Sequence, residues 1–176
     1  MQRRQTRAPK DRLKPIGVEL LQSKRWLPHW QQGGATYFVT FRASVELSPK
    51  LRAVVLSAAR HFDGKRYTLW AAVVMPDHVH LLLTPREVEP GQWWSLSSIL
   101  HSVKAYTAKE VNCRLGRAGA VWMQESFDRI VRDEEEFREK WTYIRNNPLT
   151  RALCERADDW DALYERASEY TPGGTG

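Results

Sequence analysis

Residues 66–85 read RYTLWAAVVMPDHVHLLLTP, and this stretch decides the fold. Its two runs rich in β-branched and aromatic residues, 66–75 and 78–85, are typical of strands. Between them stand Pro76 and Asp77. Because proline presets φ and aspartate tolerates turn geometry, this pair predicts a tight turn. The stretch therefore predicts a β-hairpin whose second strand begins with two histidines.

The chain on both sides of this hairpin alternates between strand and helix patterns. In the helix expected over 48–62, Ser48 is the cap and Pro49 takes the first helical position. The other expected elements are a strand over 35–43, a helix from about 95 to 115, a strand over 126–132, a helix over 133–147 that stops at Asn-Asn-Pro, and a short helix within 155–165. The order β-α-β-β-α-β with an extra C-terminal helical segment predicts an α+β, ferredoxin-like antiparallel sheet with helices on one face. The other face is left for a ligand or a partner.

Positive charge gathers at the N-terminus. The chain of 176 residues has a formal net charge of +6, and residues 1–14 account for +5 of it. A basic arm can track a phosphate backbone, and it can equally be a solubilising tail. We expect a basic, flexible arm over 1–26, a single domain over 27–165 and a disordered tail over 166–176. The basic residues of the arm are Arg3, Arg4, Arg7, Lys10, Arg12 and Lys14.

The sequence gives no sign of a membrane or secretory segment. No stretch has the roughly 20 consecutive apolar residues that span a bilayer. Residues 1–15 lack the apolar segment of a secretory signal. Cys113 and Cys154 show no metal-binding or redox spacing. These features predict a cytoplasmic protein that contacts no membrane.

The histidine pair of the second hairpin strand is a candidate site. Because side chains alternate along a strand, His78 and His80 point to one face, with Cα atoms roughly 6.7 Å apart. Val79 points to the other face, where it can join Leu81 and Leu83 in the core. Two imidazoles on one face can bind one metal ion, or they can be an idle surface pair. A metal site also needs a third ligand.

The helix that follows the hairpin offers a candidate for that ligand. Tyr106 and Glu110 are four residues apart and therefore lie on one helix face. A carboxylate beside two imidazoles makes a three-ligand site that suits Mg²⁺ or Mn²⁺, and other transition metals too. The alternatives are a boundary tyrosine with its hydroxyl in water, and a solvated helix acid paired with Lys109 or Arg114.

The two motifs together, MPDHVHLLL (75–83) and KAYTAKEVN (104–112), resemble the single-tyrosine HUH transposases and, among them, the REP-associated tyrosine transposases. HUH denotes His, hydrophobic, His. The resemblance implies a ferredoxin-like nuclease fold, with 27–165 as the catalytic domain. It extends over most of the chain, through LPHWQQGGATYFVTFR (27–42), VWMQESFDRIVRDEEEF (121–137) and YIRNNPLTRAL (143–153).

This resemblance implies roles for particular residues. His78 and His80 match the metal-binding pair. Tyr106 matches the nucleophilic tyrosine, and Glu110 stands where many relatives place glutamine as the third ligand. Asp77 stands where asparagine is frequent.

The implied activity is metal-dependent cleavage of single-stranded DNA and strand transfer through a 5′-phosphotyrosine, with Mg or Mn as cofactor. The covalent bond keeps the phosphoester energy for rejoining, so no ATP is needed. The implied partner is hairpin-forming repeat DNA, bound by a monomer or a homodimer. Candidate DNA contacts are the basic arm residues, Lys104, and Trp30 as a stacking platform. The alternatives are a nucleic-acid-binding protein without catalysis on a similar sheet, and a decayed transposase.

Overall fold

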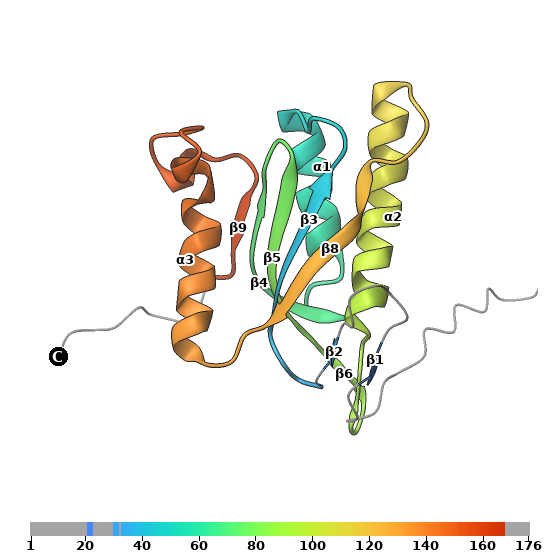
Figure 1. Cartoon of the computed structure of the whole chain (residues 1–176), viewed down its shortest axis with the longest axis vertical. Helices are drawn as coiled ribbons and strands as arrows, with labels where there is room; N and C mark the ends of the chain where they lie inside the picture. Colours follow the sequence, from blue (N-terminus) through green and yellow to red (C-terminus); the bar gives the residue numbers. More distant parts are fainter. Residues whose placement is uncertain (1–20, 23–29, 32, 168–176) are drawn as a thin grey trace, which may run out of the picture.

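The computed structural model describes residues 21–22, 30–31 and 33–167, and its elements form an α+β fold (Figure 1). The helices are α1 (Pro49–His61), α2 (Leu96–Leu115), α3 (Glu134–Thr150) and the short 3₁₀ helix η1 (Ala157–Asp159). The strands of the main sheet are β3 (Tyr37–Ala43), β4 (Tyr67–Val74), β5 (His78–Pro85), β8 (Trp122–Ile130) and β9 (Leu163–Glu165). Two small pairs join β1 (Leu21–Gln22) to β2 (Trp30–Gln31) and β6 (Glu87–Glu89) to β7 (Gln92–Trp93).

The main sheet is antiparallel throughout, in the order β8-β3-β5-β4-β9, so the predicted ferredoxin-like fold is confirmed. The predicted hairpin is the pair β4 and β5, with Val74 opposite Val79. The N–H of Met75 donates to the carbonyl of His78 (2.8 Å) and closes the turn. None of the described helices is long and apolar enough to cross a bilayer.

The sheet has two apolar faces, and helices cover both. One face carries Val79 and Leu81 into a large core with α1 and α2. The opposite face carries Phe38 and Leu82 into a smaller cluster with Ile144 of α3. Figure 1 shows α2 and α3 on opposite sides of the strands. The expectation of helices on one face therefore holds for α1 and α2, whereas the extra segment α3 packs on the face that was expected to be open.

The largest differences from the sequence prediction lie in the C-terminal part of the chain. α3 continues through Pro148, because the fixed φ of proline is compatible with a helix and the lost hydrogen bond falls in its last turn. β8 begins at Trp122, before the expected residue 126. The helix expected within 155–165 is instead η1 followed by β9, which pairs with β4.

Candidate functional site

His78 and His80 are buried side by side on the face of the sheet that α3 partly covers. Their ring centroids lie 4.6 Å apart, with the rings inclined at 73°. Val79 between them points into the opposite core. The alternation of β5 thus brings two imidazoles to one place, as the sequence predicts.

Each imidazole is oriented by a hydrogen bond at Nδ1. His78 Nδ1 donates to the carboxylate of Asp77 (2.6 Å), and His80 Nδ1 is hydrogen-bonded to the hydroxyl of Thr40 (2.8 Å). The Nε2 atom of His80 is buried and has no hydrogen-bond partner among the described residues. Metal-ligating histidines are held in this way, with one ring nitrogen fixed by a neighbouring group and the other left for the ion.

The surroundings keep His80 neutral. Burial lowers the pKa of His80 to about 3, and the charges of His78 and Arg151 act in the same direction, followed by that of Arg42. Partial burial alone would raise the pKa of Asp77, but the hydrogen bond from His78 and the nearby charges lower it overall. At neutral pH the His80 imidazole is therefore neutral, which is the form that binds a metal, and the Asp77 carboxylate is ionised.

α3 brings two further side chains to this face. The Tyr143 ring lies 5.1 Å from the His80 ring, centroid to centroid, and Tyr143 is 49% exposed. Asn147 follows one turn later, and it is buried with no hydrogen-bond partner at Oδ1 among the described residues. After another turn, Arg151 forms an ion pair with Asp77 (3.6 Å).

These contacts indicate where Asn147 lies. Tyr143 and Asn147 are four residues apart and share one face of α3, and Arg151, the C-cap of the helix, follows at the same interval. Since Tyr143 contacts His80 and Arg151 pairs with Asp77, the helix face between them runs alongside the two histidines. A phenol, an unpartnered imidazole nitrogen and an unpartnered amide oxygen are thus gathered in one region.

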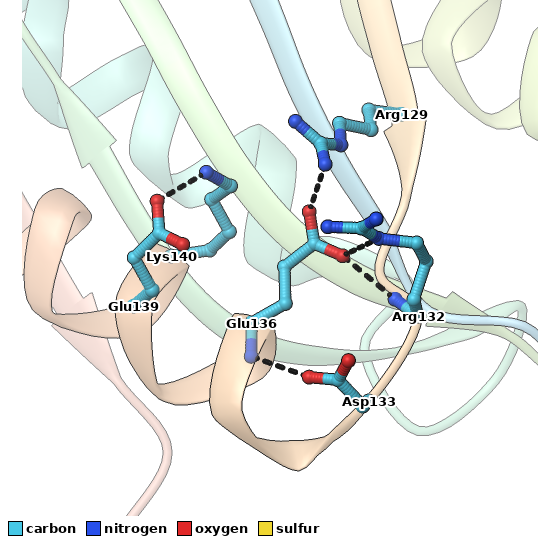
Figure 2. Close-up of polar contacts among 6 residues, drawn as sticks. All are labelled: Arg129, Arg132, Asp133, Glu136, Glu139 and Lys140. Atoms are coloured by element: carbon cyan, nitrogen blue, oxygen red, sulfur yellow. Dashed lines mark hydrogen bonds and ion pairs between the residues drawn. The ribbon is translucent and has the colours of Figure 1, made fainter.

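The start of α3 is anchored by a buried carboxylate. Figure 2 shows Glu136 between Arg129 of β8 and Arg132, with ion-pair distances of 2.7 and 2.9 Å. The backbone N–H of Glu136 donates to Asp133, the N-cap of the helix (2.8 Å). Hydrogen bonds from Arg132 lower the pKa of Glu136, so the carboxylate stays ionised at neutral pH. The first turn of α3 is thereby tied to β8.

The second half of α3 is anchored as well. Arg145 pairs with Asp158 (2.8 Å) and with Glu165 of β9. The indole N–H of Trp141 donates to the same Glu165 (2.6 Å). Polar contacts therefore hold the helix on both sides of Tyr143, so that its ring is carried by a fixed element.

The structure does not bring Tyr106 and Glu110 to the histidines. Both lie on α2, which packs against the other face of the sheet, so the sheet separates them from His80. Tyr106 is 55% exposed and faces α1 across a cavity of about 490 Å³. Glu110 pairs with Arg114 on its own helix, as in the solvated-acid alternative. The geometry gives no support to Tyr106 as nucleophile or to Glu110 as third ligand.

Among the predicted DNA contacts, only Lys104 has a described side chain, and it lies away from this site. Trp30 is described only through the backbone of β2. Lys104 donates from Nζ to the carbonyl of Met123 (3.0 Å) and lies over the Phe41 ring, on the α2 side of the sheet. The basic residues predicted to contact DNA from the N-terminal arm all lie outside the described residues: Arg3, Arg4, Arg7, Lys10, Arg12 and Lys14.

Sequence reasoning missed Tyr143 and Asn147. Both occur in YIRNNP, which the sequence analysis used only as part of the family resemblance and as a helix stop. Their spacing of four residues was an available signal, because it places both on one helix face just as it does for Tyr106 and Glu110.

The donor set at the histidines is unusual for a metal site. Among the described residues, no three His, Cys, Asp or Glu side chains gather where they could hold an ion. A third protein ligand from the described residues would therefore be of another type, and the amide oxygen of Asn147 is unpartnered among them. Imidazole nitrogen combined with amide oxygen is compatible with Mn²⁺ and with other divalent metals.

Comparisons with known proteins agree with this fold. No protein-family model matches the chain. A curated protein of Haemophilus influenzae, described as "Putative REP-associated tyrosine transposase", is 23% identical over 95 residues, which cover 51% of this chain and 54% of that protein. The match thus spans about half the length of the curated relative. A solved structure of a REP-associated tyrosine transposase bound to a REP hairpin matches with a TM-score of 0.59 and 21% identity, over 81% of this chain and 82% of the other.

The chain resembles REP-associated tyrosine transposases in sequence and in fold. This confirms the resemblance expected from the HUH motif. A further solved structure, described as a "putative transposase" from Deinococcus radiodurans, matches at 17% identity with a TM-score of 0.46, over 72% of this chain and 97% of the other.

Proposed function

We propose that the chain cuts and rejoins single-stranded DNA through a covalent bond to Tyr143, next to a bound divalent ion. His78, His80 and Asn147 would hold the ion. The observation that carries the proposal is the contact of the Tyr143 ring with the buried ring of His80, beside His78. Asn147 lies one turn further along the same face of α3, with its buried amide oxygen unpartnered among the described residues. Similarity to REP-associated tyrosine transposases supports DNA as the substrate.

Two buried polar atoms support the ion. His80 Nε2 and Asn147 Oδ1 have no hydrogen-bond partner among the described residues. Each buried polar group left unpaired costs roughly 1–3 kcal/mol, and a divalent ion bonded to both atoms would remove that cost. Mn²⁺ suits these donors, and Mg²⁺ suits them if it keeps several waters. When bound, such an ion supplies positive charge to the phosphate oxygens of a substrate.

Tyr143 is placed to act as the nucleophile, because it is half exposed and a strand can reach its hydroxyl. The phenol oxygen attacks the phosphorus of a phosphodiester in line and loses its proton to solvent. A new O–P bond forms, the bond from phosphorus to the 3′ oxygen breaks, and the departing oxygen takes up a proton to become a 3′-hydroxyl. The 5′-phosphotyrosine retains the ester, so rejoining is the reverse attack and needs no ATP.

Positive charges around the site favour an anionic backbone. Arg42 is exposed on β3, directly opposite His78 in the register with β5. Arg151 lies at the other side, against Asp77. Two guanidinium groups near the histidines raise the local concentration of a phosphate backbone. Hairpin-forming repeat DNA is the first substrate to test, because the solved relative is bound to a REP hairpin.

Incubation with a single-stranded hairpin oligonucleotide and Mn²⁺, followed by denaturing electrophoresis, tests the proposal. The wild-type chain is expected to form a covalent protein–DNA adduct that a chelator prevents. Mass spectrometry of the digested adduct is expected to find the nucleotide on the peptide that contains Tyr143. A chain that binds DNA but forms no adduct with any divalent metal would be a nucleic-acid-binding protein or a decayed transposase, and the proposal would be wrong.

A further inference from the structure

Strand β8 exposes Phe127 and half-buries the polar residues on either side of it. Phe127 is 59% exposed, while its neighbours Ser126 and Asp128 occupy the half-buried positions of the strand. A strand at the edge of a sheet normally turns its apolar positions toward the core. Single exposed apolar residues are common, so exposure alone does not indicate a binding role for Phe127. Its position relative to the candidate site is the second observation.

Phe127 lies in the same cross-strand row as the candidate site. It is directly opposite Thr40 of β3, and Thr40 is directly opposite His80 of β5. Directly paired residues point to the same face of a sheet, so the three side chains share the face of the histidines. Two strand spacings place the Cα atoms of Phe127 and His80 roughly 10 Å apart. The residue between them is the one whose hydroxyl holds His80.

Cationic side chains stand on the same face as Phe127. Arg42 lies on β3, two residues after Thr40, and is exposed. No carboxylate of the described residues forms an ion pair with Arg42. Arg129 lies two residues after Phe127, opposite Phe38. This part of the sheet therefore offers an aromatic surface beside a guanidinium group that is paired with no carboxylate of the described residues.

From this arrangement we infer that Phe127 and Arg42 form a binding subsite for one unpaired nucleotide next to the scissile phosphate. Phe127 stacks on the base, and Arg42 contacts a backbone phosphate close to His78. The inference rests on the proposed function and assigns to it a nucleotide position. Every base has a π-face, so a stacking subsite of this kind accepts bases with little regard to sequence.

The charge of the surface favours a nucleotide over a second copy of the chain. β8 is an edge strand, and an exposed phenylalanine on an edge can also serve contact between copies. Arg129 is already paired with Glu136 (2.7 Å), so Arg42 carries this argument. A contact between copies would set Arg42 near its counterpart unless acidic groups intervened, whereas a DNA backbone neutralises it. If β8 instead forms a contact between copies, substitutions on it will shift the monomer–dimer equilibrium.

The first experiment measures stacking without cleavage. In a Tyr143→Phe background, 2-aminopurine is placed at successive positions on each side of the scissile phosphate of a single-stranded oligonucleotide. One position is expected to show fluorescence quenching on binding, and Phe127→Ala is expected to remove that quenching and weaken binding roughly 5- to 100-fold. Phe127→Tyr is expected to restore both. Met123→Ala, which shortens another exposed apolar side chain of β8, is the matched control and is expected to behave as the parent chain.

The second experiment tests Arg42. Arg42→Ala is expected to make the salt dependence of binding shallower by about 0.7 in the log–log slope, the share of one phosphate on a single strand. Arg42→Lys is expected to keep the slope. Equal quenching, affinity and slope in Phe127→Ala, Arg42→Ala and the parent would overturn the subsite. So would unchanged DNA binding combined with a shift in the monomer–dimer equilibrium measured by sedimentation.

The two proposals fail in different ways. A wild-type chain that quenches 2-aminopurine through Phe127 but never forms the adduct with Tyr143 would retain the subsite and lose the strand-transfer chemistry. A wild-type chain that forms the adduct, with Phe127→Ala equally able to bind and cleave, would retain the chemistry and lose the subsite.

Discussion

Two helices of this fold carry the same pattern, a tyrosine followed four residues later by a side chain with an oxygen donor, and only one of them faces the histidines. On α2 the pair is Tyr106 and Glu110, and on α3 it is Tyr143 and Asn147. Glu110 is paired with Arg114, whereas the Asn147 oxygen is buried without a partner among the described residues. Spacing identifies residues that share a helix face, and the layer on which the helix packs decides what that face meets.

The direction of the strands explains the two layers. α1 connects the parallel strands β3 and β4, and α3 connects the parallel strands β8 and β9. Both connections cross the sheet toward the same edge, but β8 runs opposite to β3. Since crossovers between parallel strands are right-handed, reversing the starting strand places α3 on the opposite face from α1. The same rule places α2, between β5 and β8, on the face of α1.

The largest expected difference between the two helices is in adduct formation when the tyrosine of each helix is replaced by phenylalanine. Tyr143→Phe is expected to reduce covalent adduct with hairpin DNA to background, because the attacking oxygen is removed. Tyr106→Phe is expected to leave it at the wild-type level. Denaturing electrophoresis of both variants with Mn²⁺ decides between them. If Tyr143→Phe forms the adduct and Tyr106→Phe does not, the nucleophile is Tyr106 of α2 and the proposal is wrong.

The second contrast concerns the oxygen donors. Asn147→Ala is expected to raise the Mn²⁺ concentration needed for cleavage at least about 10-fold, since groups that merely orient a metal ligand already contribute that much. Asn147→Asp is expected to restore binding, and Glu110→Ala is expected to change nothing. Calorimetric titration with Mn²⁺ measures the affinities directly. Equal affinity in Asn147→Ala and wild type would exclude this amide as a ligand.

Weakening the attachment of α3 to β8 is expected to lower both the stability of the protein and the rate of adduct formation, with a smaller effect on the adduct than the loss of Tyr143. Glu136→Gln removes the buried charge that holds Arg129 and Arg132 (Figure 2), and the unfolding midpoint is expected to fall by roughly 4–8 °C. Adduct formation is expected to slow, because Tyr143 is less firmly placed. Glu139→Gln is the control, since its pair with Lys140 involves an exposed carboxylate. Thermal denaturation followed by circular dichroism would refute the role of Glu136 if both variants melt alike.

The most gradual expected effect is a pH dependence of the free energy of unfolding in the metal-free protein, spread over several pH units. The pKa of His80 is about 3 in the folded chain, against an ordinary value near 6.5 when unfolded. Below about pH 6.5 the unfolded chain therefore binds a proton that the folded chain does not. As the pH is lowered from that value toward 3, the free energy of unfolding falls by at most about 1.4 kcal/mol for each pH unit. The lowered pKa of Asp77 adds a loss only below about pH 4.

Urea denaturation with a chelator present, between about pH 4 and pH 7, measures that dependence. His80→Gln is expected to flatten it, because the substituted side chain does not titrate. A slope that is unchanged in His80→Gln would assign the pH dependence to other groups.

The sequence was sufficient where structure depends on neighbours in the chain. The hairpin over 66–85, the start of α1 at Ser48 and Pro49, and the shared face of the two histidines follow from turn chemistry, capping and alternation. β9 could not be found in this way, because its three residues become a strand only by pairing with β4. Without β9 the crossover that carries α3 has no end point, so the face that receives Tyr143 and Asn147 could not be derived.

The proposed donor set has a consequence for the order in which partners assemble. Imidazole nitrogens and an amide oxygen would bring no negative charge to a divalent ion, and the nearby carboxylate of Asp77 is already paired with Arg151. The exposed Arg42 adds further positive charge, and an incoming polyanion would neutralise such a centre. The ion and the DNA strand must then strengthen each other's binding by the same factor, since coupling between two binding equilibria is reciprocal. A chain without DNA would hold the ion weakly, and the metal centre would become complete only on the strand it is about to cut.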